Sequence, residues 1–473
     1  MVRLLAVVLS IAALVQEPDQ KPETSSQNPA LVPGAISERI ACGADAKQGY
    51  SVFLPSTYSA ARRWPVVYFL DARGNAKVPL ERFRAGAEEL GFVLVSSYNS
   101  RSDTKDDPNT PALRAMWKDA HERLAVDDRR AYLSGFSGGA RASVAMALLA
   151  PSAIAGVVGC GAGFADEDAP IKSLAFPYFG TVGERDMNYY EMRGLDEKLA
   201  KAKAAYRIGF FDGGHEWAPE ALAREALAFL EVRAMRSGLR PVDAALAARL
   251  YGEDLERAKA LEAAGRPDRA LQRLRDAARD FDGLCDVAAA RSGTERLEKA
   301  GDAARLEKEA RKRDERDRGQ LHRISARLSQ ALAEADPPAS AVLANELGVP
   351  ALRERAASSD ANDRLSAERI IANLRAQTGF YLPEHFLERG DLTRARLLLG
   401  VAGSIDPQNP AGDYNLACAS ARSGDVALAL RDLDHALAKG FKNLQMIDTD
   451  PDFEKIRTDP RFQKWLQDAR AKS

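Results

Sequence analysis

Residues 135–139 carry the clearest chemical signal in the chain. They read Gly-Phe-Ser-Gly-Gly, a Gly-x-Ser-x-Gly pattern between a short strand-like run and an Ala-rich stretch. This order predicts a sharp strand-to-helix turn that exposes the Ser137 hydroxyl at the end of a sheet. The tight bend needs residues without a Cβ at Gly135 and Gly139. Serine is a weak nucleophile until a neighbouring base accepts its proton, so a base should lie nearby.

A candidate acid and a candidate base follow the serine along the chain. Asp186 lies in the loop after one predicted strand, and His215 lies in a Gly-Gly-His loop after the next. A neutral imidazole can accept a proton from serine near pH 7, and a carboxylate on its other nitrogen fixes the tautomer. Glu184 and Asp212 are the competing acids. We therefore predict Ser137 as nucleophile, His215 as base and Asp186 as the acid.

Backbone amides near the serine are expected to bind a negatively charged oxygen. The first N–H groups of a helix are unpaired, so Gly138 can donate to a developing oxyanion. A second donor should come from the loop after the predicted strand 65–70, where Ala72 and Arg73 are the candidates. Asp71 in that loop is unusual, because a carboxylate beside an oxyanion is unfavourable unless it is paired. Arg73 is the expected partner.

The elements that must position these residues alternate between apolar runs and amphipathic segments from residue 36 to about residue 233. That alternation is typical of a mainly parallel sheet with helices on both faces. Strands are predicted at 49–54, 65–70, 92–97, 131–135, 154–160, 177–182 and 207–211. Helices are predicted at 80–90, 111–124, 140–149, 189–203 and 218–233. Because ligands bind beyond the carboxyl ends of such strands, the three loops should meet at one edge.

The segment 50–217 resembles the α/β-hydrolase superfamily. Within it the segment is similar to secreted serine esterases of the feruloyl-esterase, polyhydroxyalkanoate-depolymerase and dienelactone-hydrolase type. The motifs that carry the resemblance are Gly135-Phe136-Ser137-Gly138-Gly139, Gly183-Glu184-Arg185-Asp186 and Gly214-His215-Glu216-Trp217. The resemblance implies a serine esterase whose nucleophile, acid and base are Ser137, Asp186 and His215. The alternative is a catalytically weak or inactive hydrolase scaffold whose C-terminal repeat region mediates protein–protein binding.

Four aromatic residues near predicted strand ends are candidates for the substrate pocket: Tyr98, Phe164, Tyr189 and Trp217. Ordinary packing is the alternative for each. The polar segment 99–102 is a further candidate substrate contact. Only 26 residues separate Cys160 from Asp186, and a helix and a strand should occupy much of that interval. No room is left for a lid domain, so we expect an open site that favours bulky, branched or polymer-attached esters.

Composition and the N-terminus bear on where the protein acts. The 473-residue chain has a net charge of −1, which argues against nucleic acid or an anionic membrane as its main partner. Residues 1–16 resemble a secretory signal peptide, with Arg3 ahead of an apolar stretch too short to span a bilayer. An uncleaved anchor is the alternative. Residues 17–35, rich in Pro, Gln, Ser and Glu, should form a disordered linker. We predict a secreted or periplasmic protein.

The cysteines give no sign of a metal site. The chain has four, Cys42, Cys160, Cys285 and Cys418, and their spacing is not that of zinc ligands. They are scattered through apolar or Ala-rich surroundings, so we expect small buried hydrophobic residues rather than disulfides. We expect neither a metal nor a cofactor.

After residue 242 strand-like runs give way to sequence rich in Ala, Leu, Arg and Glu. Gly390-Asp391 recurs 34 residues later at Gly424-Asp425, and Ala395, Leu399 and Ala402 recur at Ala429, Leu433 and Ala436. This period resembles tetratricopeptide (TPR) helical hairpins, whose concave faces often bind peptides or partner proteins. We predict an α/β-hydrolase domain at 36–236 and a TPR-like all-α solenoid at 242–473. Asp450-Pro451 and Asp459-Pro460 should start its capping helices.

Overall fold

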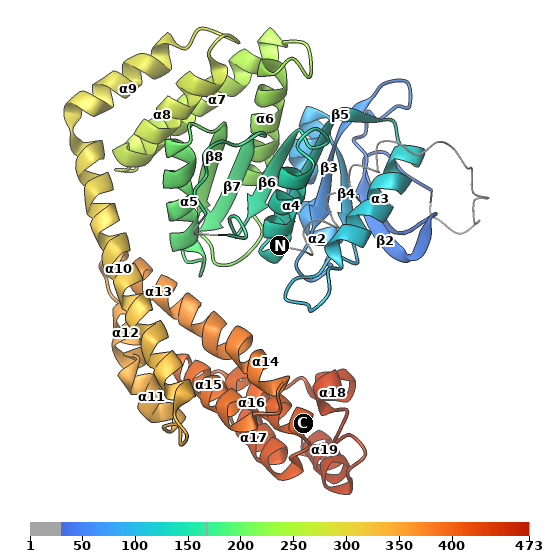
Figure 1. Ribbon diagram of the computed structural model, residues 1–473, viewed down its shortest axis with the longest axis vertical. Coiled ribbons are helices and arrows are strands. Elements are labelled where there is room, and N and C mark those ends of the chain that lie inside the picture. Colours follow the sequence, from blue (N-terminus) through green and yellow to red (C-terminus); the bar gives the residue numbers. More distant parts are fainter. Residues whose placement is uncertain (1–29, 167–168, 473) are drawn as a thin grey trace. The chain divides into compact units, whose positions relative to one another are not determined.

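The computed structural model describes residues 30–166 and 169–472. The chain divides into two compact units, Met1–Arg311 and Lys312–Ser473 (Figure 1). This division lies later than residue 242, where composition changes, so the first helices of the Ala-rich region pack with the sheet-bearing unit. The predicted signal peptide at 1–16 and most of the predicted linker at 17–35 lie outside the described residues. Within the described residues, no helix combines the length and apolar character needed to cross a membrane.

An eight-stranded sheet forms the centre of the first unit, in the order β1-β2-β4-β3-β5-β6-β7-β8. The strands are β1 (Ile36–Cys42), β2 (Asp45–Phe53), β3 (Trp64–Leu70), β4 (Val93–Ser97), β5 (Val126–Phe136), β6 (Gly156–Cys160), β7 (Tyr178–Gly183) and β8 (Tyr206–Phe211). β1 and β2 are antiparallel to their neighbours, and the other six strands run parallel. The mainly parallel sheet expected from the sequence is therefore present.

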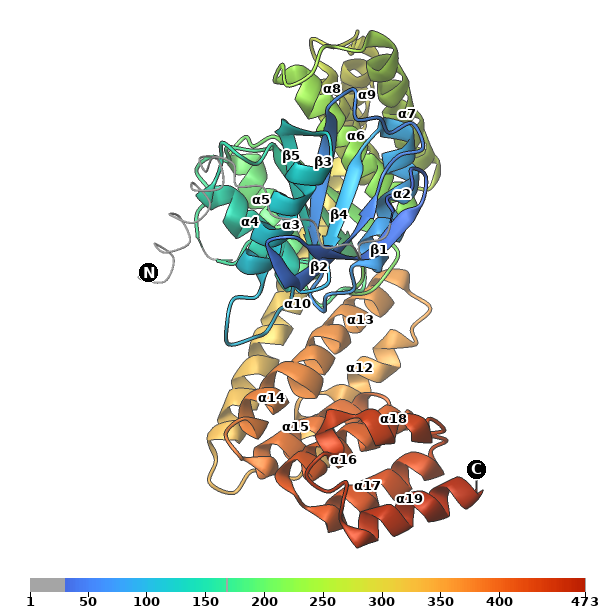
Figure 2. The same ribbon diagram turned by 90° about the vertical axis from the view of Figure 1, so that its right-hand side faces the viewer.

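Helices cover both faces of this sheet, as Figure 2 shows. On one side lie α3 (Asn109–Arg123), α4 (Gly138–Leu149) and α5 (Tyr189–Lys201), and on the other α2 (Lys77–Leu90) and α6 (Glu220–Arg236). A hydrophobic core lies on each face of the sheet, and β3 contributes side chains to both because successive side chains of a strand point to opposite faces. Val66, Tyr68 and Leu70 join the first core, whereas Val67 and Phe69 join the second.

Strand β1 is the one element of the sheet that the sequence analysis missed. Its register against β2 shifts between Ser37 and Ile40, and Arg39 has a positive φ of 56°. Such a bulge interrupts the alternation of buried and exposed side chains on which strand prediction depends. The β1 sequence therefore lacks a strand-like periodicity although its backbone pairs with β2.

A helical hairpin, α7 (Ala244–Ala263) and α8 (Pro267–Phe281), is tied to the edge strand β8 by buried charges. Arg207 on β8 lies 2.8 Å from a carboxylate oxygen of Asp254 and 2.8 Å from one of Asp280. Arg279 donates to the Tyr206 carbonyl at 2.7 Å, so α8 also binds backbone of the edge strand. These bonds explain why the hairpin belongs to the sheet-bearing unit.

The ionised state of this cluster is fixed by its neighbours. Burial alone raises the pKa of Asp280, but Arg207 and Arg279 outweigh it and hold that pKa below its ordinary value. The carboxyl of Asp254 behaves in the same way, because Arg207 and Arg273 oppose its desolvation. Both carboxylates therefore stay charged, and each depends on Arg207 for compensation.

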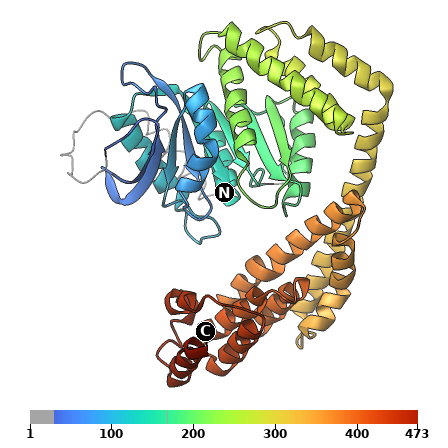
Figure 3. The same ribbon diagram turned by 180° about the vertical axis from the view of Figure 1, so that it is seen from behind.

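The described residues of the second unit form helices and turns (Figure 3). Helix α9 (Ala288–Ala300) precedes it, and α10 (Asp302–Ala333) crosses the division between the units. There follow α11 (Ser340–Glu346), α12 (Val349–Ala356), α13 (Ala361–Ala376), the π-helix η2 (Gln377–Tyr381), α14 (Leu382–Leu387), α15 (Leu392–Ile405), α16 (Pro410–Ser423), α17 (Val426–Ala438), α18 (Leu444–Thr449), the 3-10 helix η3 (Pro451–Phe453) and α19 (Pro460–Lys472).

The 34-residue period corresponds to repeated helix starts. Gly390 and Gly424 both have positive φ, of 77° and 85°, and end a helical segment. Asp391 and Asp425 then cap α15 and α17, each accepting a hydrogen bond from a first-turn amide at 3.0 Å. The helical hairpins are thus present, whereas their assignment to the TPR class stays a prediction.

Replacing Arg207 with Met should lower the free energy of unfolding by about 3–5 kcal/mol, because two buried carboxylates lose their partner. Urea unfolding of the full chain measures this loss. Arg291→Met is the matched control, since Arg291 pairs with Asp282 at the surface, with side chains 60% and 55% exposed. The control should change stability by less than about 0.5 kcal/mol. Equal effects of the two substitutions would contradict the role given to Arg207.

Candidate active site

Ser137 occupies the turn between β5 and α4 and has an unusual backbone conformation, with φ 55° and ψ −122°. Its amide donates to the Cys160 carbonyl at 2.8 Å. A Cβ on Gly139 would lie 1.9 Å from the Leu70 carbonyl oxygen, and one on Gly135 would lie 2.2 Å from Gly139. The two glycines therefore serve close packing, and the positive φ falls on the serine itself.

The three predicted catalytic side chains form one hydrogen-bonded chain. His215 Nε2 lies 3.0 Å from Ser137 Oγ, and His215 Nδ1 lies 2.9 and 3.0 Å from the two carboxylate oxygens of Asp186. This geometry suits the tautomer in which Nδ1–H donates to Asp186 and Nε2 accepts from the serine hydroxyl. The imidazole is 24% exposed, whereas Asp186 is fully buried. A substrate can therefore approach the imidazole but not the acid.

The competing acids lie with other partners. Asp212 forms an ion pair with Arg185, and its side chain is 84% exposed. The Glu184 carboxylate lies 3.7 Å from the Arg269 guanidinium and forms an ion pair with it. The hydrogen bonds between Asp186 and His215 therefore make Asp186 the candidate orienting carboxylate.

Burial is the dominant influence on Asp186. Desolvation raises the pKa of its carboxyl, and the hydrogen bond from His215 only partly offsets this. The Asn188 amide also donates to Asp186 Oδ1 at 2.8 Å, while the Asn188 side chain donates to the Gly161 carbonyl at 2.8 Å. The acid is thus held in place by the loop that follows β7.

The hydrogen bonds in the loop after β3 reduce the number of candidate oxyanion donors. The Arg73 amide donates to Asp71 Oδ1 at 2.8 Å, so it is not free for a substrate oxygen. The amides of Gly138 and Ala72 have no acceptor among the described contacts, which leaves these two as the candidate donors. Of the two alternatives that the sequence left open in this loop, Ala72 is the one that fits.

Asp71 is buried and satisfied, so it does not face the candidate oxyanion site as an unpaired charge. Its Oδ1 accepts from the amides of Arg73 and Asn75 at 2.8 and 2.9 Å, and its Oδ2 accepts from Trp217 Nε1 at 2.8 Å. None of its described contacts involves the Arg73 guanidinium, so the expected Arg73 pairing is wrong. The carboxylate instead ties the loop after β3 to the loop that carries His215.

Trp217 extends this connection to the serine turn. Its ring lies 5.6 Å from that of Phe136, which in turn lies 4.7 Å from the His215 ring. Trp217 is only 5% exposed. Trp217, predicted to line the pocket, is therefore a buried residue that connects the loops of Asp71, Ser137 and His215.

The contacts described for the side chains of Tyr98 and Tyr189 include residues of the sheet but not the candidate catalytic side chains. The Tyr98 hydroxyl lies 2.7 Å from Ser51 Oγ on β2, so its ring is held against that strand. Tyr189 is 5% exposed and packs its ring 5.7 Å from Phe210 on β8. Packing against the sheet, the alternative considered for both residues, accounts for their positions.

The connection between β6 and β7 contains no helix in its described residues, contrary to expectation. It is an irregular loop held from two sides. Arg141 on α4 donates to the Phe164 carbonyl at 3.1 Å, and the Gly163 amide donates to Glu191 on α5 at 2.7 Å. Arg141 and Glu191 also form a two-pronged ion pair, so the helices after the nucleophile and after the acid are joined directly.

A cavity of about 850 Å³ in the first unit lies elsewhere, between β8, α5 and the helices α7, α8 and α10. Its lining includes Glu184 but none of the three catalytic side chains. Ion pairs such as Arg193–Glu307, at 3.1 Å, occupy its walls. Because ion pairs line this cavity and none of the three candidate catalytic side chains does, we keep the candidate active site at Ser137.

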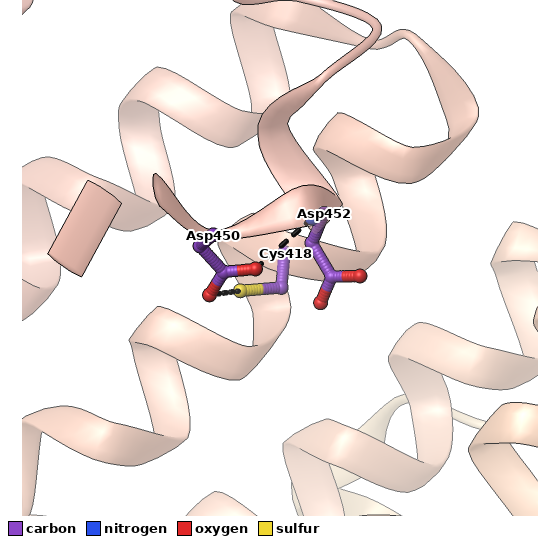
Figure 4. Close-up of side chains that lie close together, drawn as sticks. All are labelled: Cys418, Asp450 and Asp452. Carbon is purple, nitrogen blue, oxygen red and sulfur yellow. Dashed lines mark hydrogen bonds between the residues drawn. The ribbon is translucent and has the colours of Figure 1, made fainter. Parts of the chain in front are cut away.

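One group in the described part of the chain brings three metal-type ligand atoms within 4.8 Å of one another: Cys418, Asp450 and Asp452 (Figure 4). Protein contacts account for it. Asp450 accepts from the Tyr414 hydroxyl at 2.6 Å and from the Asp452 amide at 2.9 Å, which caps η3. Burial raises the pKa of the Cys418 thiol, so it is not a ready thiolate ligand. We assign the group to helix capping.

Comparison with known proteins finds similar solved structures but no matching sequence. No protein-family model matches the sequence, and no curated protein sequence matches it. Similar structures include fluorophosphonate-binding serine hydrolase F of Staphylococcus aureus, with 12% identity, 42% of this chain and 98% of the other covered, and a TM-score of 0.35. An S-formylglutathione hydrolase of Agrobacterium tumefaciens has 15% identity, 39% and 90% coverage and a TM-score of 0.32. A ferulic acid esterase has 15% identity, 38% and 88% coverage and a TM-score of 0.30.

Replacing Asp186 with Asn should lower kcat about 10⁴-fold, because the imidazole loses its orienting charge. The same substitution should stabilise the fold at about pH 7.5, and the gain should shrink towards about pH 4. The raised pKa means that the folded state holds this proton more tightly than the unfolded chain. Stability contributed by the protonated carboxyl is therefore lost as the pH rises through the folded-state pKa.

Urea unfolding and ester hydrolysis at both pH values measure these effects. Asp212→Asn is the matched control, because Asp212 is exposed and has no described contact with His215. It should leave both quantities close to wild type. A destabilised Asp186→Asn protein at pH 7.5 would count against the desolvation argument.

Replacing Trp217 with Phe deletes the indole N–H and leaves a buried oxygen of Asp71 without its donor. We expect a loss of about 1–3 kcal/mol in stability and a roughly 10- to 100-fold fall in kcat from misplacement of the two loops. Trp465→Phe is the control, because Trp465 donates to Asp434 at 2.7 Å in the other unit. If both variants retain wild-type kcat, the loop connection is not needed for catalysis.

Proposed function

We propose that the chain is a serine hydrolase that cleaves carboxylic esters through an acyl-enzyme on Ser137. The observation that carries the proposal is the unbroken hydrogen-bonded chain from Ser137 through His215 to Asp186. A hydroxyl, an imidazole and a buried carboxylate in this order can generate a nucleophile near neutral pH. The free amides of Gly138 and Ala72 complete the set by offering donors to the oxygen that becomes negatively charged.

In the first half of the reaction, Ser137 Oγ attacks the ester carbonyl carbon while its proton moves to His215 Nε2. The carbonyl oxygen becomes an oxyanion, which the Gly138 and Ala72 amides stabilise. Asp186 stabilises the imidazolium that forms. The tetrahedral intermediate then collapses, the bond to the alcohol oxygen breaks, and His215 Nε2–H returns its proton to the departing alcohol.

In the second half, a water molecule replaces the alcohol. His215 Nε2 takes one proton from the water as its oxygen attacks the acyl carbon. The same amides stabilise the second oxyanion, and its collapse expels Ser137 Oγ, which recovers the proton from the imidazolium. The carboxylic acid leaves, and the net reaction consumes one water for each ester bond broken.

The alternative of an inactive scaffold has lost its best support. It was favoured by Asp71, a carboxylate expected to disturb the oxyanion site. Asp71 is instead bonded to the Trp217 indole and to two amides, so three N–H donors compensate its charge. We propose an active enzyme. Export through residues 1–16 and binding of a protein or peptide by the helical repeats are kept as proposals from the sequence.

Hydrolysis of p-nitrophenyl acetate and butyrate by the full chain tests this function. Ser137→Ala should lower kcat by roughly 10⁴-fold or more, because the acyl-enzyme cannot form. A fluorophosphonate probe should label the wild-type protein and not this variant. Ser237→Ala removes a hydroxyl that bonds the Arg233 carbonyl at the end of α6 and serves as the control. Equal rates and equal labelling of wild type and Ser137→Ala would overturn the proposal.

A further inference from the structure

The loop after β4 is fixed in position over the loop that carries Ala72. The Ser102 amide donates to the Ala72 carbonyl at 2.9 Å. One residue earlier, the amide of Arg101 donates to Asn109 Oδ1 at 3.1 Å, and its carbonyl accepts from Asn109 Nδ2 at 2.8 Å. The peptide group between Arg101 and Ser102 is thus bonded through both its carbonyl and its N–H, and the Arg101 amide is bonded as well, so the backbone that leads into Ser102 is held by the fold.

A further bond fixes the same two loops to each other. Ser100 Oγ donates to the Asp71 carbonyl at 2.8 Å, and Ser100 is fully buried. The contact lies next to Ala72 along the chain. The loop after β4 therefore binds two successive residues of the loop after β3: Ser100 binds the carbonyl of Asp71, and Ser102 binds the carbonyl of Ala72.

Against this fixed backbone, the hydroxyl of Ser102 stands out. Its Oγ is shielded from solvent and has no hydrogen-bond partner among the described residues. A Cβ added to Gly138 would lie 2.2 Å from this oxygen and 2.5 Å from Ser102 Cβ. The Ser102 side chain therefore occupies the space that a side chain at residue 138 would fill. It touches Gly138 on one side and its own amide binds Ala72 on the other.

Gly138 and Ala72 are the two residues whose amides are free to bind the oxyanion. We infer that the Ser102 hydroxyl is a third donor to that oxyanion, which makes Ser102 a catalytic residue. The inference rests on the proposed ester hydrolysis and deepens it. A buried hydroxyl without a partner is unfavourable, so its persistence in a site with fixed backbone calls for an acceptor. The carbonyl oxygen of a bound ester supplies one, and its acceptor strength grows as charge develops.

The inference also explains the glycine at residue 138. A Cβ at residue 138 would lie 2.2 Å from Ser102 Oγ, so the serine side chain in its present position requires a residue without a Cβ there. Ser102 stays neutral, and its proton stays on Oγ throughout.

The test compares Ser102→Ala with wild type in the full-length protein. We expect kcat for p-nitrophenyl butyrate to fall on the order of 100-fold while KM changes by less than about threefold. The inhibition constant of a trifluoromethyl ketone, which forms an oxyanion on the serine, should rise in parallel with the loss of kcat/KM. Thermal stability should be unchanged or higher, because the hydroxyl has no bond to lose.

Two further variants make the outcome decisive. Thr104→Ala removes a hydroxyl from the same loop whose described hydrogen bond is to the Asp106 carbonyl, at 2.9 Å, and should leave kcat within about twofold of wild type. Ser102→Cys keeps the shape of the side chain with a larger atom and a weaker donor, and should give an intermediate kcat.

Fluorophosphonate labelling of wild-type Ser137 tests the proposed function separately. If wild type is labelled and active but Ser102→Ala keeps its kcat and its ketone affinity, the inference alone fails. A fall in kcat without a matching loss of ketone affinity would also overturn it, since Ser102 would then act only through the structure. Without labelling or activity in wild type, the proposed function fails first.

Discussion

The position of Ser137 depends on how closely the turn after β5 packs against the end of β3. A Cβ on Gly139 would lie 1.9 Å from the Leu70 carbonyl oxygen, so no larger residue fits without moving one element. This contact brings the start of α4 close to the end of β3, next to Ser137 with its positive φ of 55°. Backbone strain of this kind persists only where surrounding contacts hold it. It projects the hydroxyl away from the sheet, towards the imidazole of His215.

Two buried carboxylates serve this site in opposite ways. Asp71 is surrounded by three N–H donors, so its charge is compensated and it stabilises the loops around it. Asp186 has fewer donors, and burial raises its pKa, so the fold keeps it ionised at a cost. Catalytic groups often reduce stability, because function needs a charge that the interior disfavours. The hydrogen bond between Asp71 and Trp217 stabilises the loop that carries His215, and His215 is the hydrogen-bond partner of Asp186.

Most of the sheet was predictable because parallel strands buried on both faces read as apolar runs between amphipathic helices. Strand β1 was not, since the bulge near Arg39 breaks its periodicity. The helix expected between Cys160 and Asp186 was wrong, because side chains of α4 and α5 hold that segment as an irregular loop. The division at Arg311 was also hidden, since buried ion pairs such as Arg207–Asp254 join residues far apart in sequence.

The sequence by itself determined the strand-to-helix turn at Ser137 and the order in which Ser137, Asp186 and His215 follow their strands, because local patterns of glycine, strand and loop specify which residues follow which strand. It could not decide between the amides of Ala72 and Arg73, the partner of Asp71, or the place of Ser102. Those choices depend on hydrogen bonds between loops that follow different strands. Only the tertiary structure brings such loops together, because the direction of a single N–H or O–H group is set by the packing of the whole sheet.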